Sequence, residues 1–143
     1  MPVADIQVVI DSADPARAAS FWAEALGYVV QPPPPGFASW DAFADAIGLP
    51  PERRNDQAAV VDPDGHRPRV FFQRVPEPKT VKNRVHLDIN VGAGLDGEPR
   101  RSKVRARAVE LESLGARQLR VVDELTGWCV VMSDPEGNEF CLQ

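Results

Sequence analysis

The chain has 143 residues, of which 43% are hydrophobic, and its formal net charge of −5 comes with no dominant run of Lys or Arg. This length corresponds to about one ordinary domain with a packed core, and the lack of a basic stripe argues against a nucleic-acid partner. No apolar stretch approaches the roughly 20 residues that cross a bilayer, and two cysteines do not indicate a disulfide framework, so we expect a soluble cytoplasmic protein.

The first half of the chain has the pattern of a strand, a helix, a short strand and a hairpin. Asp14 and Pro15 indicate the N-cap and first turn of the helix, and Gly27 is placed to end it. Trp40 and Phe43 have helical spacing inside a proline-rich insertion, so a short helix there either closes over a pocket or packs in a minor peripheral core. The predicted elements are strands at 6–11, 28–30, 57–62 and 69–75, and helices at 14–26 and about 40–47.

The second half repeats this order after a polar, proline-bearing linker at 76–83. Its first strand, predicted over 83–91, alternates strictly between apolar and polar residues, which is typical of a strand with two unlike faces. Its polar face carries Arg84, His86, Asp88 and Asn90. The remaining predicted elements are a helix at 99–114 and strands at 118–122, 128–133 and 139–142.

The two halves share local signals at equivalent places. Both helices end in Leu-Gly, at Gly27 and Gly115, and both hairpins turn at Asp-Pro-acid-Gly, beginning at Asp62 and Asp134. A repeated strand–helix–three-strand unit predicts an α+β fold with two βαβββ modules, which form a curved, open barrel-like mixed sheet with helices on its outer face. Within one domain of residues 1–143, we expect module one at about 1–75 and module two at about 84–143.

The helices should cover the more apolar face of each sheet, so that the opposite faces line a cleft. The residues expected beneath the helices are Ile6, Val8, Ile10, Val70, Phe72, Val85, Leu87, Ile89, Phe140 and Leu142. The candidates for binding a small-molecule ligand are Gln7, Gln73, His86, Cys141, Arg84, Asp88 and Trp40.

Several of these side chains have more than one interpretation. His86 is a metal ligand, a catalytic base or hydrogen-bond donor to a bound ligand, or simply the partner of Asp88. Cys141 is either a small buried hydrophobe or a reactive thiol, and Cys129 on the partner strand of the same hairpin could lie near it. Arg84 either holds an anionic ligand or forms a surface ion pair.

Three segments, 14–27, 84–88 and 131–140, resemble the vicinal oxygen chelate superfamily of glyoxalases, bleomycin-resistance proteins and dioxygenases. The last segment is the most specific, because a strand that ends in Asp-Pro-acid-Gly-Asn before a final strand is frequent in that superfamily. The resemblance implies paired βαβββ modules, a site inside each curved sheet and a homodimer. It also implies metal-ligand positions at Gln7, Gln73, His86 and Cys141, with Zn, Fe, Mn or Ni as the possible divalent metal. Gln73 and Cys141 stand where many metal enzymes of the superfamily have glutamate.

The sequence therefore predicts, first, a glyoxalase-like protein that binds a small organic ligand, because neutral amides replace carboxylates at the implied ligand positions. The alternative is a metal-dependent lyase, isomerase or dioxygenase, and a third hypothesis is a non-catalytic module used in assembly. The expected partner is a small molecule, with neither nucleic acid nor membrane.

Overall fold

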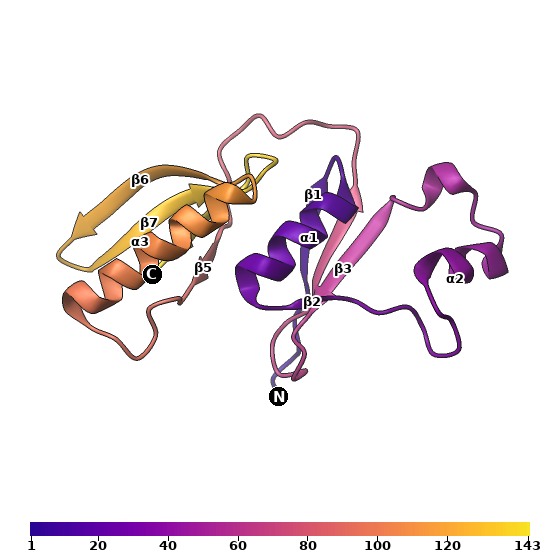
Figure 1. Cartoon of the computed structure of the whole chain (residues 1–143), viewed down its shortest axis with the longest axis horizontal. Coiled ribbons are helices and arrows are strands. Elements are labelled where there is room, and N and C mark those ends of the chain that lie inside the picture. The colour runs from indigo at the N-terminus through magenta and orange to yellow at the C-terminus, as the bar shows by residue number, and fades with distance from the viewer. The chain divides into compact units, whose positions relative to one another are not determined.

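Two four-stranded mixed sheets, each with a helix packed on one face, make up the fold (Figure 1). The computed structural model describes residues 1–143, and the chain separates into two units, Met1–Pro78 and Lys79–Gln143. Each unit contains a strand, a helix and three further strands in that order, and the first unit has an additional short helix. Neither sheet closes on itself, so the predicted α+β class with open mixed sheets is confirmed.

In the first unit, the sheet has the strand order β1-β4-β3-β2, with β1 and β4 parallel and the other pairs antiparallel. Its elements are β1 (Val8–Ser12), α1 (Pro15–Leu26), β2 (Val29–Val30), α2 (Trp40–Ile47), a 3₁₀ turn (Pro51–Arg53), β3 (Gln57–Val61) and β4 (Val70–Arg74). The Asp14 carboxylate accepts a hydrogen bond from the Arg17 backbone N–H, and Gly27 ends α1 with a φ of 69°. Trp22 of α1 and Phe72 of β4 are both buried in the resulting core.

Helix α2 holds a small aromatic cluster of its own. The rings of Phe37 and Trp40 both meet Phe43 edge-on, at centroid distances of 5.2 and 5.8 Å. The indole N–H of Trp40 donates to the backbone carbonyl of Gln31 at 2.8 Å, and the side chain stays partly exposed. These contacts favour peripheral packing of α2 over the alternative in which its aromatic residues close over a pocket.

In the second unit, the sheet has the equivalent strand order β5-β8-β7-β6, with β5 and β8 parallel. Its elements are β5 (Leu87–Ile89), α3 (Gly97–Ser113), β6 (Arg117–Glu124), β7 (Gly127–Ser133) and β8 (Glu139–Leu142). Leu111 of α3 and Phe140 of β8 are completely buried between the helix and the sheet. The carboxylate of Asp134 accepts backbone hydrogen bonds from Glu136 and Asn138, which forms the tight turn between β7 and β8.

Two strands, β1 and β5, begin later than the sequence pattern predicts, and this exposes residues that were expected beneath a helix. β5 covers only three residues of the predicted 83–91 strand, and β1 begins at Val8, so Val85 and Ile6 lie outside the strands and are exposed rather than covered by a helix. The reason for the short β5 is its partner, because β5 pairs only with β8, which begins at Glu139 directly after a tight turn. At that point the Asn83 side-chain oxygen, and not a strand carbonyl, accepts the backbone N–H of Glu139.

None of the helices combines the length and the apolar character that crossing a membrane requires.

Candidate functional site

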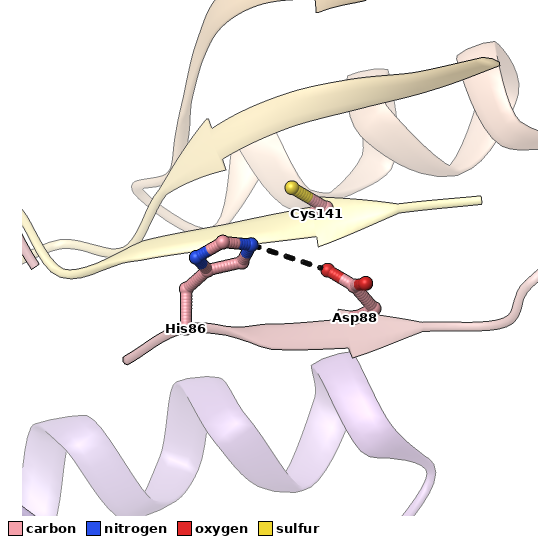
Figure 2. A group of neighbouring side chains, drawn as sticks. All are labelled: His86, Asp88 and Cys141. Atoms are coloured by element: carbon pink, nitrogen blue, oxygen red, sulfur yellow. Dashed lines mark ion pairs between the residues drawn. The ribbon is translucent and has the colours of Figure 1, made fainter. Parts of the chain in front are cut away.

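Three side chains of metal-ligand type gather on one face of the second sheet (Figure 2). Asp88 of β5 lies directly opposite Cys141 of β8, and His86 precedes Asp88 by two residues, so it emerges on the same side of the strand. Their ligand atoms all lie within 4.8 Å of one another. Because Phe140 and Leu142 on either side of Cys141 are buried, these three residues project from the face opposite α3. We call His86, Asp88 and Cys141 the ligand triangle.

The ligand triangle combines exposed and buried groups. The side chains of His86 and Asp88 are 45% and 47% exposed, and the His86 Nε2 lies 3.5 Å from an Asp88 carboxylate oxygen. Cys141 is 7% exposed. Burial, together with the neighbouring Cys129 and Asp88, raises the pKa of the Cys141 thiol to about 12. Without a metal ion, the triangle therefore presents a neutral thiol beside an imidazole–carboxylate pair that solvent can reach.

The spacing of these atoms fits a single metal ion. Ligands about 2.1 Å from a tetrahedral centre are about 3.4 Å apart, which is close to the 3.5 Å between the His86 nitrogen and the Asp88 oxygen. A sulfur ligand and a nitrogen or oxygen ligand of one tetrahedral zinc ion lie about 3.6 Å apart, so the most distant ligand atoms, at up to 4.8 Å, would have to approach by about 1 Å through side-chain rotation. Nitrogen, oxygen and sulfur donors are all accepted by zinc. The residues present therefore fit a divalent metal.

Glu139 lies on β8 two residues before Cys141, but its carboxylate is already engaged. It forms an ion pair with Lys82, and this hydrogen bond holds the pKa of Glu139 below its usual range. A carboxylate that is held ionised by a lysine is poorly suited to accept a proton, so Glu139 is a weaker candidate for general base than the exposed pair of His86 and Asp88.

The two glutamines that the sequence pairs with this site lie in the first unit. Gln7 accepts a hydrogen bond from Arg69 at 2.6 Å, and Gln73 donates one to Asp11 at 2.9 Å. Asp11 lies opposite Gln73 in the parallel register, so Gln7 and Gln73 are offset by four residues, or about 13 Å along the strands. This sheet therefore does not bring the two glutamines together.

The first sheet also has no equivalent of the ligand triangle. If Gln7 corresponds to His86, the positions of Asp88 and Cys141 correspond to Val9 and Phe71, which pair in the same parallel register. Neither side chain carries a metal-binding atom. The ligand atoms are thus concentrated on the second sheet alone.

The last two predicted ligand-binding residues are Arg84 and Trp40. Arg84 is exposed and precedes β5, two residues before His86. Trp40 belongs to α2 of the first unit, where its N–H is already bound to a backbone carbonyl.

A cavity of about 550 Å³ at the end of the second sheet was not foreseen from the sequence, and no residue of the ligand triangle lines it. Asn90 and Gln143 line it just beyond the ends of β5 and β8, and their side chains are hydrogen-bonded at 2.9 Å. Trp128, another lining residue, contacts Arg101 and Arg105 of α3, so the cavity reaches the helix side of the sheet rather than the ligand triangle. Its other walls include Gly92, Gly97, Arg100 and Trp128. The glycine-rich loop after β5 is the sequence signal that could have indicated it.

Sequence reasoning also did not count Asp88 among the metal ligands, although it placed the residue on the correct face. The alternation of polar residues gave the face, but the register that sets Asp88 opposite Cys141 could not be read from it.

A family model described as a glyoxalase-like domain matches residues 7–143. No curated protein matches the chain. Among solved structures, a possible glyoxalase from Bacillus cereus is 13% identical, with 99% of each chain covered and a TM-score of 0.61. A variant of the fosfomycin resistance protein FosX from Listeria monocytogenes, complexed with Mn(II) and 1S,2S-dihydroxypropylphosphonic acid, is 9% identical, with 100% of this chain and 90% of that chain covered and a TM-score of 0.62. The bleomycin-binding protein of Streptomyces verticillus, complexed with copper(II)-bleomycin, is 17% identical, with coverages of 100% and 97% and a TM-score of 0.54.

Proposed function

The chain belongs to the glyoxalase-like domain family, and on this premise we propose that it binds a small organic ligand on the second sheet, through a divalent metal ion held by the ligand triangle. The observation that carries this proposal is the clustering of three different ligand atoms, from His86, Asp88 and Cys141, within 4.8 Å. A metal in this position would act as a Lewis acid toward an oxygen atom of the ligand.

The residues of the chain divide the work of binding. His86 and Asp88 are exposed enough to meet both an ion and an organic ligand, whereas Cys141 is buried and supplies an anchor from the sheet itself. The cavity at the end of the sheet is not lined by the triangle, so the organic ligand contacts the sheet face on which His86 and Asp88 are exposed.

Catalysis at the same site, as a lyase, isomerase or dioxygenase, is the second candidate. It is favoured by the partial exposure of His86 and Asp88, which would leave the ion that they hold open to a substrate oxygen. We further propose a homodimer in solution, which follows from the family resemblance and which light scattering on the purified protein would test.

Metal analysis of the purified protein tests the main proposal. We expect near-stoichiometric metal when Zn, Fe, Mn and Ni are assayed together, and loss of that metal in a His86→Ala variant. His66→Ala is the matched control, because His66 is the other histidine and is exposed in the turn between β3 and β4. A wild-type protein that takes up none of these metals, or a His66→Ala variant that loses them equally, would remove the basis of the proposal.

A further inference from the structure

An arginine is held in a fixed position on the open face of the first sheet. Because Phe72 of β4 is buried beneath α1, Arg69 and Phe71 project from the opposite face of the sheet. The Nε and Nη1 of Arg69 donate hydrogen bonds to the side-chain oxygens of Gln31 and Gln7, both at 2.6 Å. Its guanidinium lies over the ring of Phe71, 5.1 Å from the centroid. Gln7 precedes edge strand β1 and Gln31 follows edge strand β2, so Arg69 is held from both sides.

The positive charge of Arg69 is not neutralised by a carboxylate. Six other arginines of the chain pair with an aspartate or glutamate, but Arg69 forms no ion pair. Asp11 is the one acidic residue within the four strands, and it lies opposite Gln73, four residues or about 13 Å along β4 from Arg69. The two hydrogen bonds to glutamine use two of the five N–H groups of the guanidinium, so three remain for a ligand.

An apolar strip lies next to Arg69 on the same face. Val9 of β1 lies directly opposite Phe71, and Phe71 in turn lies opposite Ala59 of β3. Val9 is 48% exposed and Phe71 is half-buried, so both have apolar surface that a ligand can still cover. A fixed cation beside partly exposed apolar side chains suits a molecule that has an anionic end and an apolar body.

We propose that Arg69 is the recognition residue of a second ligand site, on the first sheet, for a small organic acid whose apolar part packs on Val9 and Phe71. The planar guanidinium matches the two oxygens of a carboxylate, and such charge-assisted hydrogen bonds are roughly twice as strong as neutral ones. Because Gln7 and Gln31 already fix the guanidinium, binding costs little side-chain entropy there. This site needs no metal ion and does not depend on the ligand triangle.

The test uses benzoate, which joins a carboxylate to a ring, and benzamide, which is a neutral compound of the same size. Each is titrated into the full-length protein, labelled with nitrogen-15, and the backbone amide signals are followed by NMR. A chelator keeps the metal site proposed on the second sheet empty. The variants are Arg69→Gln and Arg69→Lys. Arg74→Gln is the control, because Arg74 is an exposed residue of the same strand that projects from the other face.

We expect benzoate to bind wild type with a dissociation constant of about 1–10 mM, as is ordinary for so small a ligand, and to shift the amide signals of Val9, Arg69 and Phe71. Benzamide should bind wild type roughly tenfold more weakly, and so should benzoate with Arg69→Gln, because each change removes the charge-assisted pair. Arg69→Lys should fall between wild type and Arg69→Gln, since lysine keeps the charge without the planar fork. Arg74→Gln should bind benzoate as wild type does.

Several outcomes would overturn this assignment. Wild type would exclude it by showing no saturable binding of benzoate, equal binding of benzamide, or shifts confined to the second sheet. These three readings need no variant, so the test decides even if Arg69→Gln fails to fold. Unchanged benzoate affinity in a folded Arg69→Gln variant would show that Arg69 only holds the edges of the sheet. Metal binding by the ligand triangle is measured separately, so either proposal can fail without the other.

Discussion

Zinc binding should release a whole proton from Cys141, and this consequence can be worked out from the structure. The nearly complete burial of the thiol raises its pKa to about 12. At pH 7.5, only roughly one molecule in 30,000 would then carry the thiolate that coordinates a metal. Every zinc ion bound at this position must therefore displace a proton, and the result does not depend on the exact pKa as long as it lies well above the working pH.

The expected size of the effect is tenfold in affinity for each pH unit. Since metal and proton compete for the same sulfur, lowering the pH from about 8 to about 7 should weaken zinc binding at least tenfold through Cys141 alone. The direction follows from the raised pKa, because acid always favours the protonated and metal-free form. Any other ligand that is protonated in this range adds to the slope.

Two measurements check this prediction. Zinc titrations at several pH values give the slope of log affinity against pH, which should be at least one. Titration in weakly buffered solution counts the protons directly, and a Cys141→Ser variant should release about one proton fewer per zinc than wild type. A slope well below one, or equal proton release by both proteins, would show that Cys141 does not coordinate the ion.

Three further predictions concern stability. Gly92→Ala places a methyl group 2.5 Å from the Arg100 Cγ and should destabilise the protein by about 1–3 kcal/mol in urea unfolding. Gly127→Ala is the control and should be nearly neutral, because no atom lies within 4 Å of the added methyl group. Equal effects of the two substitutions would contradict the contact between position 92 and Arg100. Phe140→Ala removes a completely buried ring and should cost about 3–5 kcal/mol in the same assay, and a loss below about 1 kcal/mol would contradict its place in the core. Backbone N–H groups in the turn between β3 and β4 donate hydrogen bonds to the Asp62 carboxylate and lower its pKa below 3.8. The free energy of unfolding of wild type should therefore exceed that of an Asp62→Asn variant above that pH, and the difference should disappear as acid protonates the carboxyl in the folded protein. A difference that stays constant between pH 7 and pH 2 would contradict this.

Local signals in the sequence were sufficient to predict most elements of the fold. Asp14 caps α1 as predicted, and Gly27 ends it in the left-handed conformation that glycine adopts without strain. Asp62 and Asp134 form the two hairpin turns through hydrogen bonds to backbone groups within five residues of themselves. Such interactions involve only near neighbours in the chain, so the sequence contains all the information that they need.

Strand lengths could not be predicted in the same way. The residues of 83–91 alternate without interruption, yet β5 covers only Leu87–Ile89 because its partner β8 is short. Alternation shows which residues can occupy two faces of a strand, but a strand exists only where a neighbour supplies hydrogen bonds. Val85 is exposed for this reason, although it belongs to the apolar set.

The candidate site shows the same division. The sequence by itself placed His86 and Asp88 on one polar face, because side chains alternate with period two along a strand. Only the tertiary structure decided that this face meets Cys141, since the register of β5 and β8 joins residues 53 positions apart and a slip of one residue would turn each side chain to the other face. Periodicity is a local property of the chain, whereas the identity of a cross-strand neighbour is set by packing of the whole sheet against its helix.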